Sequence, residues 1–400
     1  MTQIIPPPDD LPLYHILPDN PLLLMGAGPV PIPYSVAKAN SVVINHLGET
    51  MDRVIGRVKL MASYSFQTQS QHILGISGPA SAAMEMAITS VLWPSRSVLV
   101  LKNGIFSGRF AELAHGVGAT VTELETEGIA PCLPTQVEQA FSGQSFDVLT
   151  IVQGETSCGV FNRHVKEIAA IAKKNNCLVI VDAVCTLTTM PLYMDEWELD
   201  IVVTGGQKGL SSIPGVSLIA FSNRAWEVVE KRTHPMAHWV LDPRRAARFW
   251  HHQEYHYTAP VPGILAIHEA LRMICVETLE KRFARHKISS EALQEGIEGM
   301  GLELFVPPQN RLNSVVAIKL PEGIDSHRLR KFMIENYHVE ISGAFGLPIV
   351  RIGQMGEQCR PEHLFKTLYA MGMALKKQNF SVDIASAMVK LESKLEAWNT

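Results

Sequence analysis

From about residue 70 to 265, short runs of β-branched and aliphatic residues alternate with stretches of helical spacing. The runs are SVLVLK (97–102), ATVTEL (119–124), DVLTIV (147–152), LVIVD (178–182), DIVVT (200–204) and VSLIAF (216–221). Strands that are apolar along their whole length must be covered on both faces, which is typical of a mostly parallel sheet between helices. We therefore predict an α/β fold that binds its ligands at the carboxyl ends of the strands.

The chain of 400 residues, of which 46% are hydrophobic and 18% charged, is long enough for one large domain and a smaller one. Residues 1–20 are Pro-rich and irregular, so we expect an N-terminal arm at 1–25 that lies on another surface. The strand and helix pattern assigns 26–275 to the large domain. A different α+β pattern follows, and it assigns 276–400 to a smaller C-terminal domain.

The smaller domain is predicted from a few segments that follow a helical stretch at about 262–300. They are LNSVVAIKL (312–320), a helix around 326–337, PIVRIG (348–353) and a helix at 361–377. A terminal helix is indicated over 383–398 by apolar residues at roughly helical spacing. These apolar residues are Ile384, Met388, Leu391, Leu395 and Trp398.

Charge and cysteine content exclude several classes of protein. The net charge of −4 provides no basic surface for nucleic acid or an acidic membrane, so small molecules are the expected partners. The six cysteines are scattered without a C-x-x-C pair, which argues against a metal site or a disulfide framework. The N-terminus has no signal or transit pattern and no apolar run reaches about 18 residues, so we expect a soluble cytoplasmic protein.

Three motifs are candidates for the predicted binding edge. The first is ISGPASAAMEMAI (76–88), where a turn leads directly into a helix. Free N–H groups at the helix start, together with the Ser81 hydroxyl, form a potential anion site. Ser81 could equally act only as a helix cap, and for the motif alone capping is favoured.

The other two motifs contain a carboxylate and a lysine. Asp182 ends the buried strand LVIVD, where a carboxylate is costly unless it meets a cation such as a protonated pyridine nitrogen, or caps the following turn. Lys208 lies in the uncharged stretch TGGQKGLSS, where a lowered pKa would suit Schiff-base chemistry. A lone lysine is more often simply exposed. Lys208 is a candidate for Schiff-base chemistry only because a possible phosphate turn and then Asp182 precede it in the sequence.

These three motifs, together with five further segments and in their order along the chain, resemble the class V, fold-type I enzymes that use pyridoxal 5'-phosphate (PLP). Within them the sequence resembles the alanine–glyoxylate and serine–pyruvate aminotransferases, over about residues 20–380. The further matching segments are LLMGAGPVPIP near the start, NGIFSGRF (103–110), GETSCGV (154–160), EYHYTAPV (254–261) and VRIGQMG (350–356). The resemblance implies a mostly parallel, seven-stranded-type sheet with a smaller C-terminal domain.

The resemblance also implies a role for individual residues. Lys208 would be the catalytic residue, holding PLP as a Schiff base and moving a proton between the substrate Cα and the cofactor C4′. Asp182 would pair with the pyridine nitrogen, with Phe106 and Val184 on the two ring faces. The remaining residues implied at the cofactor are Pro79, Ala80, Ser81 and Gln207 at the phosphate, Ser157 near the phenolic oxygen, and Tyr255 and Thr258, which reach the phosphate of a partner subunit. A homodimer with shared active sites is therefore implied.

For the substrate, the resemblance implies that Arg351 binds the carboxylate, with Gly28 and Ser157 beside it. A guanidinium group matches a carboxylate in a bidentate manner, although a strand arginine can also simply lie at the surface. The implied reaction moves an amino group from alanine or serine to glyoxylate or pyruvate. The other functions considered are another class V reaction, of the cysteine desulfurase or C–S lyase type, and a non-catalytic protein with the PLP fold.

The sequence departs from the family in two places. The phosphate turn reads Gly-Pro-Ala-Ser, where relatives usually have a glycine-rich segment, so Pro79 and Ala80 make the backbone less permissive. The segment after Asp182 reads VCTLTTMP, where relatives commonly have Ser-x-x-Gly-Gly. Arg109 is a candidate for a second substrate arginine, but nothing in the sequence requires it.

Overall fold

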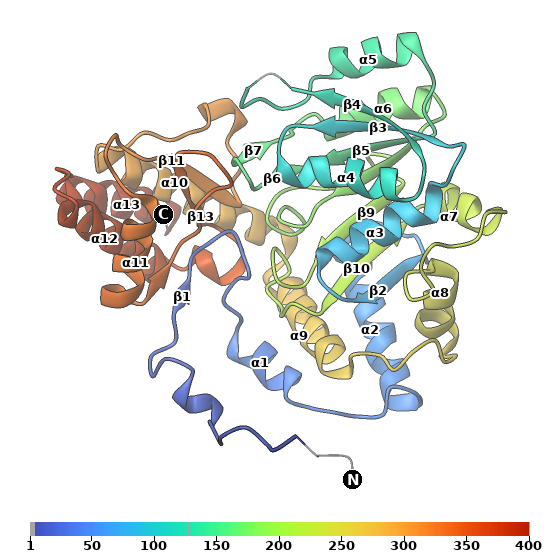
Figure 1. Cartoon of the computed structure of the whole chain (residues 1–400), viewed down its shortest axis with the longest axis horizontal. Coiled ribbons are helices and arrows are strands. Elements are labelled where there is room, and N and C mark those ends of the chain that lie inside the picture. The colour runs from blue at the N-terminus through green and yellow to red at the C-terminus, as the bar shows by residue number, and fades with distance from the viewer. Residues whose placement is uncertain (1–4, 127, 400) are drawn as a thin grey trace.

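The fold is described from a computed structural model in which residues 5–126 and 128–399 are placed, with side chains up to residue 396. A seven-stranded sheet of order β2-β10-β9-β8-β5-β3-β4 forms its centre (Figure 1). The strands are β2 (Ile73–Ser77), β3 (Ser97–Lys102), β4 (Thr120–Glu125), β5 (Val148–Val152), β8 (Leu178–Asp182), β9 (Ile201–Gly205) and β10 (Val216–Phe221). Strand β10 runs antiparallel to both its neighbours, and the other pairs are parallel. The predicted α/β fold with a mostly parallel sheet is confirmed.

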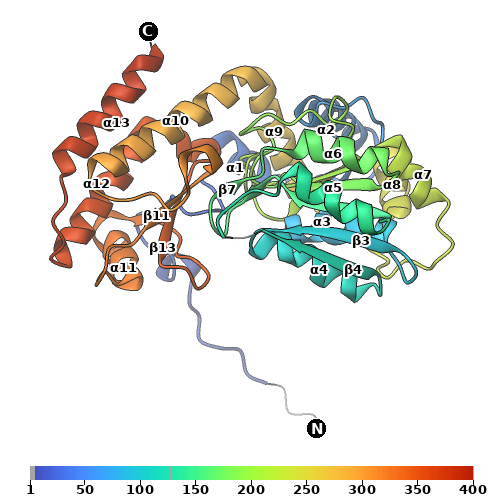
Figure 2. The same ribbon diagram turned by 90° about the horizontal axis from the view of Figure 1, so that it is seen from above.

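Helices cover both faces of this sheet, as the apolar strands require. All residues of β5, β8, β9 and β10 are buried. Figures 1 and 2 show α3 (Ala80–Val91) and α4 (Ile105–Gly116) on one face, and α6 (Val165–Lys174) and α9 (Val261–Glu277) on the other. The other helices of this part are α1 (Tyr34–Asn40), α2 (Glu49–Phe66), α5 (Pro134–Gly143), α7 (Asn223–Glu230) and α8 (Pro243–His252).

The C-terminal part has its own apolar core, to which Met25 contributes from the N-terminal side. Its strands are β11 (Val315–Lys319), antiparallel to β13 (Ile349–Gly353), and β12 (Val339–Glu340), parallel to β1 (Leu23–Leu24). Its helices are α10 (Leu279–Gly299), α11 (Ser326–Tyr337), α12 (Pro361–Lys377) and α13 (Ile384–Asn399). Helix α13 is the expected terminal helix and packs on α10; the side chain of Trp398 lies outside the described residues. The division at residues 25 and 275 stays a prediction.

Two segments differ from the sequence-based expectation. Residues 73–77 form β2, at one edge of the sheet, and are not among the strands expected from the sequence. The helical stretch predicted at 262–300 is divided at Thr278, whose φ of 67° is incompatible with a continuous helix. The break separates α9, which packs on the sheet, from α10, which belongs to the C-terminal part.

The remaining elements are short. They are the hairpin of β6 (Gly154–Glu155) and β7 (Val160–Phe161) and the 3₁₀ turns η1 (Leu13–His15), η2 (Pro308–Asn310) and η3 (Gly356–Cys359). Residues 5–21 are almost entirely exposed and extend away from the body (Figure 2). Among the helices of the described residues, none is long and apolar enough to cross a membrane.

Candidate active site

A cavity of about 140 Å³ lies beyond the carboxyl ends of β5, β8 and β9. Many of its walls come from the motifs identified in the sequence. The lining residues are Ala80, Ser81, Met84, Phe106, Arg109, Val152, Gly154, Thr156, Asp182, Val184, Cys185, Gln207 and Lys208. Seven residues predicted to bind the cofactor therefore surround one space; Pro79 adjoins it as the residue before α3.

Asp182 is the last residue of β8 and is only 5% exposed. Its Oδ1 accepts a hydrogen bond from the N–H of Val184 at 2.8 Å, so the carboxylate also caps the following turn. Burial raises the pKa of this carboxyl to about 7. A buried carboxylate with so little compensation gains most from a cationic or N–H partner inside the cavity.

Lys208 follows β9 and the Gly205–Gly206 turn and is half-buried. Its Nζ donates a hydrogen bond to the carbonyl of Ala27, from the segment that enters the C-terminal part. Burial is the main cause that lowers the pKa of the Lys208 ammonium group, and the positive charge of Arg351 acts in the same direction. A lowered pKa makes the neutral, nucleophilic amine more accessible.

Ser81 lies at the start of α3, but it does not cap the helix. Pro79 is the N-cap residue, no side chain caps the first turn, and Ser81 is the second helical residue. Its Oγ accepts a hydrogen bond from Nη1 of Arg109 at 2.9 Å. Beside it, Oε1 of Gln207 is buried without a hydrogen-bond partner among the described residues. This oxygen is an acceptor and does not itself favour an anion; the NH2 group of the same amide and the first N–H groups of α3 are the donors that an anion could use.

Glu155, which was not selected from the sequence, holds this wall of the site together. It is fully buried, and its Oε1 accepts from the N–H of Phe106 at 3.3 Å and from the N–H and Oγ of Ser157 at 3.1 and 2.5 Å. Its Oε2 accepts from the N–H of Ser107 at 2.9 Å. The carboxylate thus joins the start of α4 to the Ser157 turn; its place beside Ser157 in GETS is the only sequence signal.

Arg351 comes from β13 in the C-terminal part and is 5% exposed, so it is not a surface arginine. Its Nη1 donates to the carbonyl of Thr156 at 2.6 Å, while Nε and Nη2 donate to the carbonyl of Gly343 at 2.8 and 2.6 Å. Three of its five N–H groups are thereby used, and two remain for a ligand. These bonds hold the guanidinium at the contact between the two parts.

Ser157 lines a second, larger cavity of about 670 Å³ beside the first one. This cavity is bounded by residues of both parts, including Ile105 and Cys158 from one and Phe305 and Phe345 from the other. The ring of Phe345 also lies 6.5 Å from that of Phe106 in an edge-on arrangement. The larger cavity is thus lined at the contact between the two parts, next to residues that line the first cavity.

Tyr255 and Thr258 are not brought to the cavity within this chain. Tyr255 is 63% exposed and Thr258 is also exposed, whereas His256 between them is buried. Tyr257 instead turns inwards, with its hydroxyl 3.1 Å from Oγ of Ser77. Gly28, by contrast, lies against Lys208: a Cβ atom at this position would be 2.6 Å from Nζ of the lysine.

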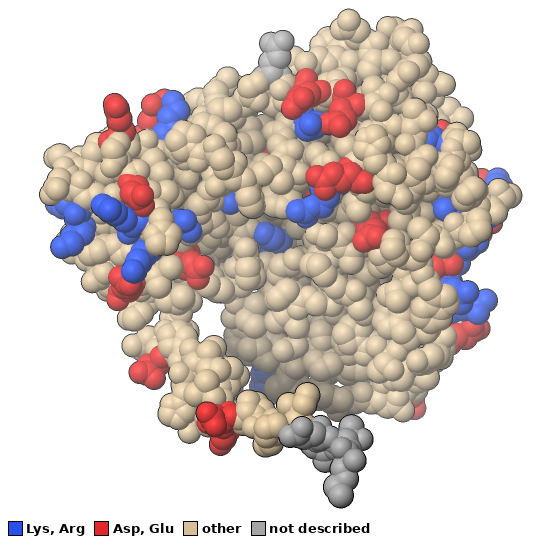
Figure 3. Space-filling model, viewed as in Figure 1, with Lys and Arg blue, Asp and Glu red and all other residues tan. Residues whose placement is uncertain are grey.

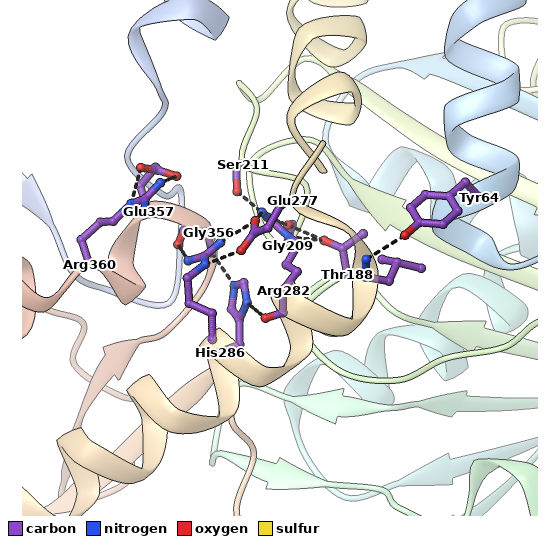
Figure 4. Close-up of polar contacts among 12 residues, drawn as sticks. Tyr64, Thr188, Gly209, Ser211, Glu277, Arg282, His286, Gly356, Glu357 and Arg360 are labelled. Atoms are coloured by element: carbon purple, nitrogen blue, oxygen red, sulfur yellow. Dashed lines mark hydrogen bonds and ion pairs between the residues drawn. The ribbon is translucent and has the colours of Figure 1, made fainter. Parts of the chain in front are cut away.

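A buried polar network joins the lysine turn to the end of β13 through the start of α10 (Figure 4). Nη2 of Arg282 donates to the carbonyl of Gly209 and to Oγ of Ser211, both at 2.9 Å. Arg285 donates to the carbonyl of Gly356 at 2.8 Å, and both arginines bind the carboxylate of Glu277. Arg282 therefore holds Gly209, the residue next to Lys208, and Arg285 holds the turn at Gly356 that follows Arg351.

Comparison with known proteins identifies the family. Residues 34–361 match the class-V aminotransferases. The alanine–glyoxylate aminotransferase of Drosophila melanogaster is 31% identical over 94% of this chain and 98% of its own length.

Two solved structures agree with this assignment. The ureidoglycine–glyoxylate aminotransferase of Bacillus subtilis superposes with a TM-score of 0.92 at 28% identity, covering 95% of this chain and 99% of its own. The alanine–glyoxylate aminotransferase of Nostoc sp. gives a TM-score of 0.87 at 29% identity, covering 90% of this chain and 96% of its own. The fold, the match over most of the chain and the identity to these relatives have one explanation: the chain belongs to the class-V aminotransferase family, a family of PLP-dependent enzymes, and is similar within it to the alanine–glyoxylate aminotransferases.

Proposed function

We propose that this aminotransferase binds PLP on Lys208 and transfers an amino group from a small amino acid, alanine or serine, to glyoxylate or pyruvate. The observation that carries the proposal is that Lys208 and Asp182 face one cavity from the ends of neighbouring strands. The similar alanine–glyoxylate and ureidoglycine–glyoxylate enzymes have glyoxylate in their names, which supports this acceptor.

The residues present fit PLP. The carboxyl of Asp182 matches a ring N–H, the NH2 group of Gln207 and the free N–H groups of α3 match a phosphate, and Phe106 and Val184 provide surfaces for a flat ring. When bound, PLP supplies an electron sink for the charge that develops at the substrate Cα.

The chain supplies the proton transfer and the orientation. The Lys208 amine would take up and hold the substrate Cα proton, because its lowered pKa favours the neutral, basic form. Asp182 would accept a hydrogen bond from the ring N–H and so favour the protonated ring nitrogen. Arg351 would bind the substrate carboxylate with its two remaining N–H groups. Ser157 lines the larger cavity, and Gly28 lies against Lys208.

A desulfurase or lyase reaction is the less favoured function. Desulfurases use a reactive cysteine, and a reactive cysteine is an accessible thiolate. Cys359, after the Arg351 strand, is buried, and burial raises the pKa of its thiol. Of the six cysteines only Cys275 is partly exposed, and burial raises its pKa too. Release of sulfide from cysteine without amino transfer would reverse this preference.

A half-reaction panel tests the proposal. The purified protein is mixed with one amino acid at a time, namely alanine, serine, glycine, glutamate, aspartate, cysteine and (S)-ureidoglycine, and the absorbance of lysine-bound PLP is followed. We expect rapid conversion with alanine or serine, and recovery of the original spectrum on addition of glyoxylate or pyruvate. Lys208→Ala is the control that binds PLP without the covalent link. A colourless protein that PLP does not reconstitute, or conversion by dicarboxylic amino acids alone, would contradict the proposal.

We further propose a cytoplasmic homodimer in which Tyr255 and Thr258 reach the phosphate site of the partner. The support is their exposure, together with the exposed apolar side chains of Leu11, Tyr14 and Ile16 in the N-terminal arm. On the face in Figure 3 the arm carries acidic but no basic side chains, so it would favour a neutral or basic surface.

Hybrid dimers test the sharing of sites. A Lys208→Ala chain and a Tyr255→Ala/Thr258→Ala chain are each expected to have little activity alone. In a mixed dimer, one site combines the intact lysine with the intact tyrosine and threonine, so activity is expected to return to about half of one dimer's value. Absence of complementation, or full activity in a monomer, would contradict shared sites.

A further inference from the structure

We propose that Arg109 is a binding residue for the cofactor phosphate, a role that rests on the proposed function and that its sequence position alone did not assign. The guanidinium supplies the positive charge at the end of the cavity formed by Ser81 and Gln207. It replaces contacts that a glycine-rich phosphate turn would make and that the Gly-Pro-Ala-Ser turn of this chain does not provide.

The position of Arg109 is defined by two contacts. Its Nη1 donates to Oγ of Ser81 at 2.9 Å, and its Cζ lies 5.1 Å from the centre of the Phe106 ring. Phe106 and Arg109 are three residues apart on α4 and therefore lie on the same side of the helix. The start of α4 is in turn fixed by Glu155, so the arginine projects into the cavity from a rigid support.

The phosphate turn leaves a need for a further donor. Pro79, at the N-cap of α3, has no N–H group, so the backbone donors begin at Ala80. A phosphate monoester carries close to two negative charges near neutral pH, and burying it requires hydrogen bonds and a cation. Of the described residues that line the cavity, only Arg109 and Lys208 are cationic. Lys208 is committed to the aldehyde carbon, which leaves Arg109 for the phosphate.

The hydrogen bond between Arg109 and Ser81 also prepares the serine hydroxyl. Because Oγ accepts from the guanidinium, its own hydrogen is free to point to another acceptor. A hydroxyl that accepts from a cation is polarised and becomes a better donor. Arg109 and Ser81 would thus act as a pair on the same phosphate oxygens, with the Gln207 amide on the other side.

The competing role for Arg109 is recognition of a second carboxylate on the substrate. Arg351 is held by the carbonyls of Thr156 and Gly343, whereas Arg109 is bound to the start of α3. The bond to Ser81 places Arg109 at the phosphate turn, so the geometry favours the phosphate. A phosphate role affects the affinity for PLP, whereas a substrate role affects the KM for dicarboxylic substrates.

Equilibrium binding of PLP and of pyridoxal, which lacks the phosphate, to the apoproteins tests the proposal without measuring turnover. The proteins are wild type, R109M, R109K and the control R96M. Arg96 is also half-buried and stacked on a ring, with Cζ 4.7 Å from the Trp93 ring, but it does not line the cavity. We expect R109M to weaken PLP binding roughly 10- to 100-fold and R109K less. Pyridoxal binding by all four proteins should agree within about threefold, which corresponds to about 0.7 kcal/mol.

The outcomes are distinguishable. Wild-type protein that does not bind PLP contradicts the proposed function itself. Equal PLP affinity of wild type and R109M, or equal losses for PLP and pyridoxal, overturns the role of Arg109. Unchanged PLP affinity with a raised KM for dicarboxylic substrates assigns it to the substrate instead. Should R109M not fold, R109Q replaces it, and the rise in Tm that inorganic phosphate gives the wild-type apoprotein should be reduced in R109Q and R109K but kept in R96M.

Discussion

The amine of Lys208 donates a hydrogen bond to the carbonyl of Ala27, a residue 181 positions earlier in the chain. The contact ties the predicted catalytic lysine to the segment that pairs with the C-terminal part through β1 and β12. Gly28, the next residue, has a φ of 100° and no side chain between its Cα and the lysine. The lysine can therefore lie flat against the backbone of this segment.

We predict that Gly28→Ala displaces the lysine. The added Cβ would lie 2.6 Å from both Cδ and Nζ of Lys208, and the flexible side chain must move away. Misplacement of a reacting group by about 1 Å can cost on the order of 100-fold in rate, so kcat should fall by roughly 10- to 100-fold. Single-turnover absorbance with the preferred amino donor measures the effect.

The control for this prediction is Gly48→Ala. Gly48 has a similar φ of 110°, but nothing lies within 4 Å of the added Cβ. Both variants share the backbone strain of a non-glycine residue at positive φ, about 1–2 kcal/mol. Equal kcat values in the two variants would show that backbone strain, and not contact with Lys208, causes any loss.

Glu155→Gln is predicted to disturb both Phe106 and Ser157. An amide has one oxygen in place of two, so at least one of the four N–H and O–H groups that point at Glu155 would face an N–H. Each donor left unsatisfied in the interior costs about 1–3 kcal/mol. We expect a lower Tm together with a higher KM for the amino donor.

The matched control is Asp200→Asn. Asp200 is also buried and accepts bonds from the N–H of Val179 and the side chains of Ser222 and Arg224, but it does not line either cavity of the site. This variant should lose stability while the KM stays near the wild-type value. A Glu155→Gln enzyme with lowered Tm and wild-type kinetics would reduce Glu155 to a structural residue.

The raised pKa of Asp182 predicts a pH-dependent stability of the apoprotein. The folded-state pKa of about 7 exceeds the ordinary value of 3.8, so between these pH values the native state binds more protons than the unfolded state. The free energy of unfolding should then fall as pH rises from about 4 to 7, relative to Asp182→Asn, by at most roughly 4 kcal/mol. Urea unfolding of both apoproteins across this range measures the difference.

The same substitution should act in the opposite sense on cofactor binding. Asp182→Asn removes the carboxylate that accepts a ring N–H, so PLP should bind more weakly and the half-reaction should slow. If the Asp182→Asn apoprotein is more stable than wild type at pH 8 but binds PLP more weakly, the effect on stability and the effect on cofactor binding are separated. Parallel unfolding curves over pH 4 to 8 would show that the carboxyl titrates near its ordinary value.

Periodicity and strand order were sufficient to predict the sheet and the strand ends where Asp182 and Lys208 lie, because buried parallel strands have a distinct apolar signature. Strand β2 was missed since its five residues, ILGIS, run directly into the phosphate turn. The break at Thr278 was also missed, because no Pro or Gly marks it and its cause is tertiary. Local patterns predict elements, but not how an edge strand or a helix junction packs.

The hydrogen-bond partners of site residues were harder to predict from the sequence than the positions of those residues in the fold. The role of Glu155 depends on N–H donors of α4, which lie about 50 residues away in the chain. No local spacing in the sequence indicates these hydrogen bonds. The contact between Arg109 and Ser81 likewise joins two helices, although the spacing from Phe106 to Arg109 placed both on one helix face. Such pairs depend on how helices sit on the sheet, which one sequence does not specify.

Arg282→Met is predicted to weaken catalysis through the lysine turn. Arg282 is 3% exposed, and its removal takes away one of the two donors to the carbonyl of Gly209, next to Lys208, while Oγ1 of Thr188 keeps the other. The variant should have a lower Tm, as expected for the loss of any buried arginine. In addition, kcat should fall about tenfold with little change in KM, because only the position of the Lys208 amine is affected. The control is Arg232→Met: this arginine is also buried and donates to backbone carbonyls, including that of Thr89, but it has no contact with the lysine turn. If both variants lose the same Tm and both keep wild-type kcat at a temperature well below unfolding, the network around Arg282 serves stability alone.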